Sequence, residues 1–403
     1  MNIRVILLRH GESTYNALKL YQGCSDESVL TARGCQQARM TGALLKNISF
    51  DAIYTSSLRR ARETAREVLE TIEPQLHPQI IKVDRRLREA NLATWEGVPF
   101  QQVQSEFAND YRCWKQTPQN LKMKLPRSQQ QNRGQEYIYP VRDLYDRVGK
   151  FWQEILPRHQ NQTLLLAAHG GTNRALISTA LGIAPFLFHT IQQSNCGISI
   201  LNFFAAKPGK ARLEALNLTT HISENLPKLK EGGKGKRLLL VSQGAIHPTQ
   251  ISKLAHLLEP VSINFSLYNE FDTSSAIANA ILENHPETVQ LPITQPNWGK
   301  IWQNTLSANN HKNNDELITG LVVASVRQIK TFFAKIFEIE STDFDHLQLQ
   351  PGTISAIHYP NSEHPPIVQA INILGFNSPE QSYFDRDGNR AIEIETPVSS
   401  AIA

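Results

Sequence analysis

Short apolar runs alternate with amphipathic stretches through the first 225 or so residues of the chain. Continuous apolar runs are typical of buried parallel strands, and apolar positions three or four residues apart predict helices. The pattern predicts strands at 5–8, 50–54, 163–168 and 197–204, and helices at 31–45, 58–72, 144–156 and from Thr172 onward. Thr31 is a suitable N-cap for the first of these helices. The alternation predicts an α/β fold with a mostly parallel sheet and helices on both faces.

The apolar pattern of the first half recurs in the second half with different polar residues. The matching pairs are 5–11 with 238–244, 164–169 with 321–326, 193–201 with 349–357, and 213–217 with 367–372. Where the first half has Arg9, His10 and His169, this alignment gives Ser242, Gln243 and Val326. We therefore predict a second, smaller and degenerate copy of the same fold, without catalytic residues.

A polar, basic and glycine-rich stretch at residues 228–236 separates the two halves. It lacks P-loop spacing and a preceding strand, so we interpret it as a solvated linker rather than a phosphate-binding loop. This places a first domain at 1–227, a second domain at 237–375 and a flexible, turn-rich tail at 376–403.

Composition excludes several classes of protein. With 403 residues, of which 40% are hydrophobic, the chain can form about two domains with ordinary cores. A net charge of +4 is small for a nucleic-acid-binding protein, and the four cysteines lack zinc-site spacing, which favours free thiols. No apolar run has the length of a membrane span or of a signal peptide. We expect a cytoplasmic protein without nucleic-acid or membrane partners, and leave open a homo-oligomer.

Candidate chemistry lies where the predicted strands end. The groups concerned are Arg9-His10, Arg59-Arg60, Glu89 and His169-Gly170-Gly171. Because ligands of open α/β sheets bind at the carboxyl ends of strands, we expect these groups to converge in one pocket. Two imidazoles and two guanidiniums, without an acidic metal cage, suit a phosphoryl group better than a metal ion.

These motifs resemble those of the histidine phosphatase superfamily, which includes the cofactor-dependent phosphoglycerate mutases. The matching stretches follow the family order and cover most of residues 1–225; they are 8–16, 22–34, 55–65, 87–97 and 168–171. The resemblance implies a three-layer α/β/α, phosphoglycerate mutase-like domain. It also implies a phosphatase that needs no metal or organic cofactor and acts on a small phosphorylated metabolite.

The resemblance assigns roles to single residues. His10 would be the nucleophile that forms a phosphohistidine, and Arg9, Arg60 and His169 would bind the phosphoryl oxygens. Glu89 would give a proton to the leaving oxygen and then take one from water. The positions that match the family's substrate pocket are Asn16, Gln22, Gly23, Ser57 and Gly170.

Mutase and phosphatase activities are alternatives within this family. The resemblance implies that a true mutase has an arginine pair after a tryptophan, whereas Trp114 is followed by a single lysine, Lys115, which favours water as acceptor. Stretches 22–31, 139–144 and 193–197 look closest to plant 2-carboxy-D-arabinitol-1-phosphatases, which implies a sugar or sugar-acid phosphate as substrate. Phosphoserine phosphatase, phosphoglycerate mutase and a non-catalytic phospholigand-binding regulator are the other hypotheses. The loop at 113–135 would cap the pocket and influence substrate choice.

Overall fold

The computed structural model describes residues 2–73, 80–127, 130, 134, 136–205, 211–294, 316–339, 346–361 and 364–374. The expected tail at 376–403 lies outside these residues. The strands of the first half are β1 (Ile3–Arg9), β2 (Ala52–Ser56), β3 (Ile81–Asp84), β6 (Thr163–Ala168), β7 (Ile198–Phe203) and β8 (Ala211–Leu218). Those of the second half are β9 (Gly235–Gln243), β10 (Phe265–Asn269), β11 (Val289–Ile293), β12 (Leu317–Ser325), β13 (Ile354–Tyr359) and β14 (Ile367–Ile373).

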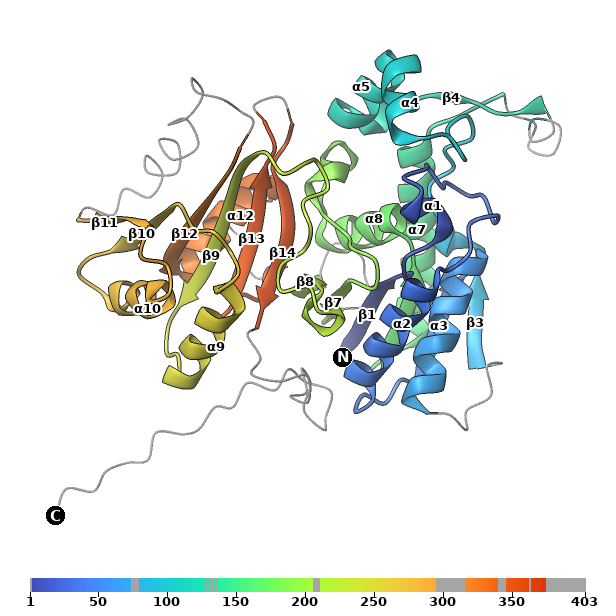
Figure 1. The fold of residues 1–403 in the computed structure, drawn as a ribbon. Coiled ribbons are helices and arrows are strands. Elements are labelled where there is room, and N and C mark those ends of the chain that lie inside the picture. The colour runs from blue at the N-terminus through green and yellow to red at the C-terminus, as the bar shows by residue number, and fades with distance from the viewer. Residues whose placement is uncertain are drawn as a thin grey trace.

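One twelve-stranded sheet runs through both halves, in the order β11-β10-β12-β9-β13-β14-β8-β7-β1-β6-β2-β3 (Figure 1). The strand order of the second half is therefore the reverse of the first, and β14 pairs with β8 where the halves meet. Pairing is parallel among β1, β6, β2 and β3, and among β9, β12, β10 and β11. The central strands β7, β8, β14 and β13 pair antiparallel, so the sheet is mixed rather than mostly parallel.

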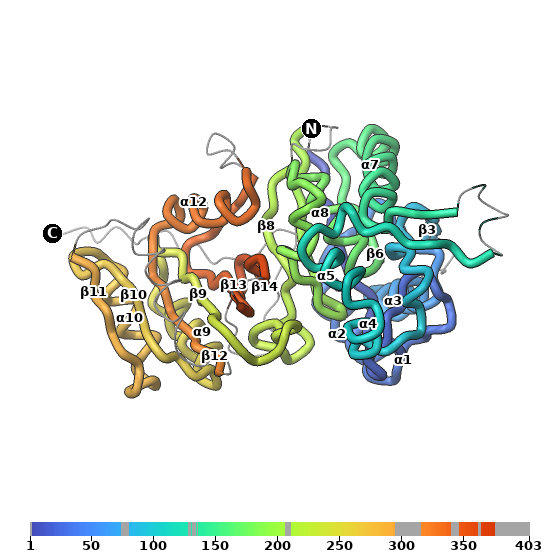
Figure 2. Tube along the Cα trace, turned by 90° about the horizontal axis from the view of Figure 1, so that it is seen from above, coloured from blue at the N-terminus to red at the C-terminus, as the bar shows by residue number. Residues whose placement is uncertain are grey.

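Helices cover both faces of the sheet. The main helices are α2 (Ala32–Leu45), α3 (Arg59–Ile72), α7 (Pro140–Arg158), α8 (Gly170–Leu181), α9 (Pro248–Leu258), α10 (Thr273–Leu282) and α12 (Val326–Phe337). Alternate residues of β1 belong to different cores: Ile6 and Leu8 to the core that also includes residues of α2, α3, α9 and α10, and Leu7 to the core that includes residues of α7, α8 and α12. Figure 2 shows these two groups of helices on opposite sides of the strands. The result is a mixed α/β fold in three layers.

Most predicted elements occur within a few residues of their expected places. Strand β6 has the predicted bounds, and Thr31 caps α2 by accepting a hydrogen bond from the Gly34 amide at 3.0 Å. Helix α7 begins four residues earlier than predicted because Pro140 occupies its first turn, where the fixed φ of proline is favourable. The short elements α1 (Thr14–Ala17), α4 (Phe100–Glu106), α5 (Ala108–Gln116), β4 (Met123–Lys124) and β5 (Tyr137–Ile138) were not predicted.

Two further expectations can be compared with the fold. The four cysteines are free thiols, as predicted. In the described part of the chain, no helix combines the length and the apolar character that crossing a membrane requires.

The sheet register corrects one residue equivalence between the halves. Arg9 pairs with Ala168 in β6, and Ser242 pairs with Ala324 in β12, so the position after Ala168 corresponds to Ser325. His169 is therefore matched by Ser325, and the alignment with Val326 was wrong by one residue. Strands buried on both faces have no polar alternation that could fix such an alignment from sequence.

Candidate active site

Two histidines lie side by side at the carboxyl edge of the sheet. Strands β1 and β6 are parallel neighbours, so His10 and His169 leave them at the same edge. Their ring centroids are 5.2 Å apart, and the rings are inclined by 58°. His10 is only 2% exposed and His169 is fully buried. The structure thus brings together the two imidazoles that the sequence placed at strand ends.

The hydrogen bond of His10 fixes which ring nitrogen is available. Nδ1 lies 2.7 Å from the Gly11 carbonyl oxygen, which can only accept, so Nδ1 holds the proton and Nε2 of the neutral ring does not. Burial, followed by the positive charges of Arg60 and Arg9, lowers the pKa of His10 well below its ordinary value. The ring is therefore neutral at neutral pH, with a free lone pair on Nε2.

His169 is held by the end of β2. Its Nε2 lies 2.7 Å from the Ser56 hydroxyl, and its Nδ1 is a buried atom without a hydrogen-bond partner among the described residues. Burial, and then the charge of Arg60, lowers the pKa of His169 as well. A second neutral imidazole therefore lies beside the first, with one ring nitrogen left for a ligand.

Two arginines are oriented by backbone carbonyl groups. Arg60, near the start of α3, is fully buried and donates to the carbonyls of Ser25 at 2.7 Å and Gly23 at 2.9 Å. Arg9 donates through Nη1 to the Gln193 carbonyl at 2.9 Å. The Nε atoms of both guanidiniums are buried and have no described partner. Such donors in a buried site are suited to an anionic ligand.

Glu89 lies across the N-terminus of α8. Its carboxylate accepts hydrogen bonds from the backbone amides of Gly171 at 2.9 Å, Thr172 at 3.0 Å and Ala90 at 2.9 Å. A Cβ on Gly171 would lie 2.5 Å from the Glu89 Oε1, so a glycine is needed for this approach. The amides and the helix dipole fix the orientation of the carboxylate beside the two histidines.

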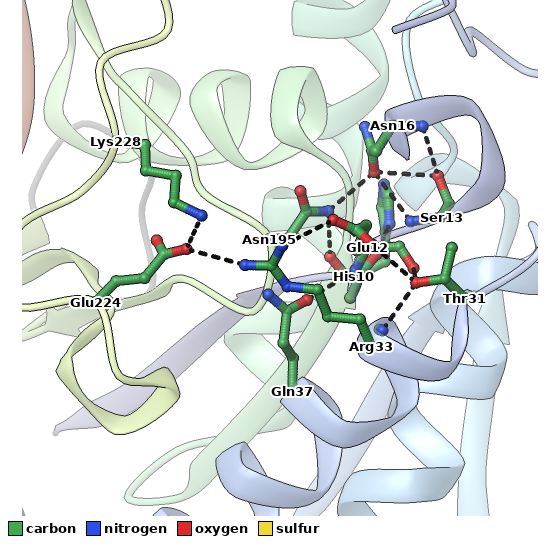
Figure 3. Close-up of polar contacts among 12 residues, drawn as sticks. His10, Glu12, Ser13, Asn16, Thr31, Arg33, Gln37, Asn195, Glu224 and Lys228 are labelled. Atoms are coloured by element: carbon green, nitrogen blue, oxygen red, sulfur yellow. Dashed lines mark hydrogen bonds and ion pairs between the residues drawn. The ribbon is translucent and has the colours of Figure 1, made fainter. Parts of the chain in front are cut away.

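An open pocket of about 720 Å³ is lined by His10, Arg9, Arg60 and Glu89, and also by the predicted Asn16, Gln22, Gly23 and Gly170. Asn16 accepts a hydrogen bond from Asn195 at 3.0 Å, and Asn195 also donates to the His10 carbonyl at 3.0 Å (Figure 3). Ser57 is not among the described lining residues; its neighbour Ser56 contacts His169 instead. Among the described residues, no three His, Cys, Asp or Glu side chains are grouped as a metal ion would require.

A family model described as "Histidine phosphatase superfamily (branch 1)" matches residues 5–219. The chain belongs to this superfamily. The 2-carboxy-D-arabinitol-1-phosphatase of Triticum aestivum is 35% identical over 245 residues, which is 60% of this chain and 46% of the wheat protein. Phosphoserine phosphatase 1 of Hydrogenobacter thermophilus is 29% identical over 55% of this chain and 95% of its own length. The crystal structure of a putative alpha-ribazole-5'-P phosphatase from Escherichia coli has a TM-score of 0.45 and 26% identity, covering 53% of this chain and 96% of that one.

The wheat protein and a probable 2-carboxy-D-arabinitol-1-phosphatase of Arabidopsis thaliana are the more similar of these relatives by sequence. This chain spans about half of the length of each, because the alignments cover 46% and 47% of them. The superfamily match ends at residue 219, so the second half of the chain lies outside it.

Several residues that line the superfamily pocket were not predicted from the sequence. From the first half these are Arg174 of α8, His189 and Gln193, and Trp114 and Lys115 of α5 also line the pocket. Arg174 lies one helical turn after Gly170, so helical spacing could have identified it as a residue of the same face. The α5 residues fall partly in the loop predicted to cap the pocket, residues 113–135.

Three lining residues come from the stretch that we had interpreted as a solvated linker: Lys228, Lys230 and Glu231. Lys228 and Lys230 are nevertheless exposed, as are residues 232–234, whereas Leu229 and Glu231 are half-buried. Glu231 accepts a hydrogen bond from Lys115 at 2.6 Å, and the Lys228 carbonyl accepts one from Gln192 at 2.9 Å. Composition predicted the solvent exposure of this stretch but not these contacts, because lysine and glycine do not indicate which partners the folded chain provides.

Proposed function

We propose that this protein is a metal-independent phosphoric monoester hydrolase that acts through a phosphohistidine on His10. The observation that supports this most is the state of His10: a neutral, buried imidazole with an unprotonated Nε2, beside the side chains of Arg9 and Arg60. A nucleophile of this kind needs no prior deprotonation, and covalent catalysis divides one difficult displacement into two easier steps.

In the proposed first step, Nε2 of His10 forms a bond to phosphorus and the bond to the leaving oxygen breaks. Glu89 gives a proton to that oxygen, so the alcohol leaves neutral. In the second step, water attacks the phosphohistidine, Glu89 takes its proton, and inorganic phosphate and free His10 result. Arg9, Arg60 and His169 stabilise the negative charge on the non-bridging oxygens in both steps. Two observations support these roles: Arg9 and Arg60 line the pocket with His10, and the His169 ring centroid lies 5.2 Å from that of His10.

We propose a small phosphorylated sugar or sugar acid as substrate, such as 2-carboxy-D-arabinitol 1-phosphate. The similarity to the wheat 2-carboxy-D-arabinitol-1-phosphatase supports this class. The pocket also contains cations beyond those around His10, among them Arg174 and Lys230, which suit a second acidic group on the substrate. Phosphoserine is the second candidate, because the Hydrogenobacter phosphoserine phosphatase aligns over 95% of its length with the first half of this chain.

Phosphate release from a panel of sugar, sugar-acid and amino-acid phosphates tests the proposed reaction. The wild type should release phosphate in the presence of a chelator, and His10→Ala should lose at least about a thousandfold in kcat. Arg60→Ala should be similarly impaired, whereas the adjacent Arg59→Ala is a matched control, since Arg59 is exposed and paired with Glu63 at 2.6 Å. Loss of wild-type activity with chelator would refute the metal-free mechanism, and an active His10→Ala would refute the phosphohistidine.

We also propose that the second half is a degenerate copy of the catalytic fold that serves as a scaffold. Its strand order, the exact reverse of the first half across β8 and β14, supports this origin. Gln243 and Ser325 take the places of His10 and His169 in the register, and neither is a nucleophile of that kind. Turnover should therefore survive Gln243→Ala, and loss of turnover in a folded Gln243→Ala protein would count against the scaffold role.

A further inference from the structure

The segment between the two halves, residues 224–234 (the connecting segment), is fixed to the first half at two places. On one side, Glu224 accepts from Lys228 at 2.9 Å and lies 3.8 Å from Arg33, which in turn lies 3.6 Å from Glu12 (Figure 3). On the other side, Glu231 forms an ion pair with Lys115 of α5 at 2.6 Å. The residues between these two ion pairs are therefore held against the pocket.

The segment is also held by the second half. The Pro227 carbonyl accepts a hydrogen bond from Arg237 of β9 at 2.8 Å, and the Lys234 carbonyl lies 2.7 Å from Nε2 of His358 in β13. Both ends of the stretch that contains Lys230 thus depend on strands of the second half. The position of Lys230 is a property of the whole chain and not of the catalytic half alone.

Lys230 lies between these anchors and next to the phosphoryl-binding groups. Its ammonium donates to the Gln193 carbonyl, the same oxygen that accepts from Nη1 of Arg9. Two donors on one oxygen lie within about 6 Å of each other, twice the length of a hydrogen bond. Lys230 is therefore close to Arg9, and it lines the same pocket as His10.

The pocket's cations differ in their partners. Arg33, Lys115 and Lys228 each face a glutamate. Among the described residues, no carboxylate lies within ion-pair distance of Lys230 or of Arg174. Arg174 packs over the Phe188 ring at 5.4 Å and lies 3.3 Å from Nδ1 of His189, and its buried Nε has no described partner. Glu89 and Glu231 act on Arg174, and Glu224 and Glu231 on Lys230, only at longer range. Two basic groups without an ion pair in one pocket are suited to bind an anion.

We propose that Lys230 and Arg174 form a second anion subsite, which binds a carboxylate or a second phosphate on the substrate. This inference rests on the proposed phosphatase function of His10 and specifies its substrate class: phosphate esters with a further anionic group a few carbon atoms away. The subsite depends on the connecting segment, so the second half contributes to specificity although it has no catalytic residues of its own.

Matched pairs of substrates test the subsite. 3-Phosphoglycerate and glycerol 3-phosphate differ by a carboxylate against a hydroxymethyl group, and fructose 1,6-bisphosphate and fructose 6-phosphate differ by a second phosphate. For each pair, the ratio of the kcat/KM values measures the effect of the second anion. The variants are Lys230→Met, which keeps the length of the side chain, and Lys230→Arg, which keeps the charge. The control is Lys46→Met, at an exposed lysine after α2 that is not among the lining residues.

In Lys230→Met, the ratio for at least one pair should fall about tenfold to a hundredfold, the usual loss for a hydrogen bond between charged groups. Lys230→Arg should recover most of it, and Lys46→Met should stay within about twofold of the wild type. A fall in the ratio for 3-phosphoglycerate and glycerol 3-phosphate alone identifies a carboxylate site. A fall in the ratio for fructose 1,6-bisphosphate and fructose 6-phosphate alone identifies a phosphate site. Unchanged ratios for both pairs in Lys230→Met, or an equal fall in Lys46→Met, would overturn the subsite.

A binding measurement separates this inference from the proposed reaction. In the His10→Ala background, which prevents turnover, calorimetry with 3-phosphoglycerate and fructose 1,6-bisphosphate should give a Kd that rises about tenfold or more for at least one of the two when Lys230→Met is added. Equal Kd values for both ligands would refute the subsite even if the wild type is a phosphatase. A Kd that rises as expected, in a protein that hydrolyses none of the substrates, would refute the phosphatase while leaving the subsite supported.

Discussion

Asn217, at the end of β8, connects the contact between the halves with the active-site loop. The residue is fully buried, and its Oδ1 accepts from the Ser194 amide at 2.6 Å while its Nδ2 donates to the Gln369 carbonyl of β14 at 2.7 Å. Ser194 lies between Gln193, whose carbonyl holds Arg9, and Asn195, which holds the His10 carbonyl. We therefore expect Asn217→Ala to lower both stability and activity.

The magnitude follows from the groups that lose their partners. A buried amide and a buried carbonyl would be left unpaired, at about 1–3 kcal/mol each. Asn217 also has a φ of +51°, a conformation that asparagine tolerates and alanine disfavours by about 1 kcal/mol. The sum is about 3–7 kcal/mol, a large share of the 5–15 kcal/mol by which a typical domain is stable. Asn217→Gly, without the φ penalty, should recover about 1 kcal/mol of this loss.

Asn372 provides the matched control, because it has the same role on the other side of the contact. It has a φ of +62°, accepts from the Gln350 amide at 3.1 Å and donates to the Glu214 carbonyl of β8 at 2.7 Å. Its partners lie outside the active site. In urea unfolding both alanine variants should lose several kcal/mol. At a temperature where both remain folded, kcat/KM for p-nitrophenyl phosphate should fall at least fivefold only in Asn217→Ala. Equal activities, or a stability loss below about 1 kcal/mol, would refute this reasoning.

Three further predictions concern single positions. In Gly34→Ala the new Cβ would lie 2.0 Å from the Glu12 carbonyl oxygen, so urea unfolding should show a loss of about 3 kcal/mol or more, or the protein should fail to fold. Gly149→Ala, inside α7 with no atom within 4 Å of the new Cβ, should instead gain about 0.5–1 kcal/mol; a loss would contradict the open space seen there. Burial lowers the pKa of His221 from 6.5 to about 4, so its contribution to stability is complete above pH 6.5 and declines as the pH falls toward 4. His221→Gln should therefore reduce the difference in unfolding free energy between pH 7.5 and pH 4.5 by about 2.7 kcal/mol, two pH units at about 1.36 kcal/mol each, and an unchanged difference would exclude His221 as the source.

The sequence located the chemistry where backbone direction alone decides the outcome. His10 and His169 follow apolar runs, and parallel neighbouring strands bring whatever follows them to one edge of the sheet. The same reasoning predicted the position of Arg60, because this residue lies in the first turn of α3, the helix that follows β2. Contacts that depend on the orientation of a single side chain were harder to predict from the sequence. Ser56 is the last residue of β2 and contacts His169, whereas the adjacent Ser57 already belongs to the bend before α3 and has no such contact.

Contacts between distant segments could not be predicted from local pattern. The stretch that contains Lys230 has the composition of a linker, and its neighbours Glu231 and Lys228 find their partners only through the folded positions of Lys115 and Glu224. The match of His169 to Val326 failed for a related reason, since an apolar strand buried on both faces can be shifted by one residue without a visible penalty in the sequence. Local patterns therefore predicted the secondary-structure elements and the residues at strand ends. The residues that line the pocket from distant segments could be identified only in the folded structure.

The place of the connecting segment follows from the directions of the strands. From β1 to β8 there are two antiparallel steps, so β8 ends at the edge of the sheet where His10 lies. From β8 through β14 and β13 to β9 there are three further antiparallel pairings. Strand β9 therefore runs opposite to β8 and begins at the edge where β8 ends. The segment between β8 and β9 must then cross β14 and β13 beside the active site, whereas β9 ends with Gln243 at the opposite edge. The reversed order of the second half thus holds Lys230 at the edge where the candidate catalytic groups lie, and a connection of this kind could not serve a second site at the other edge.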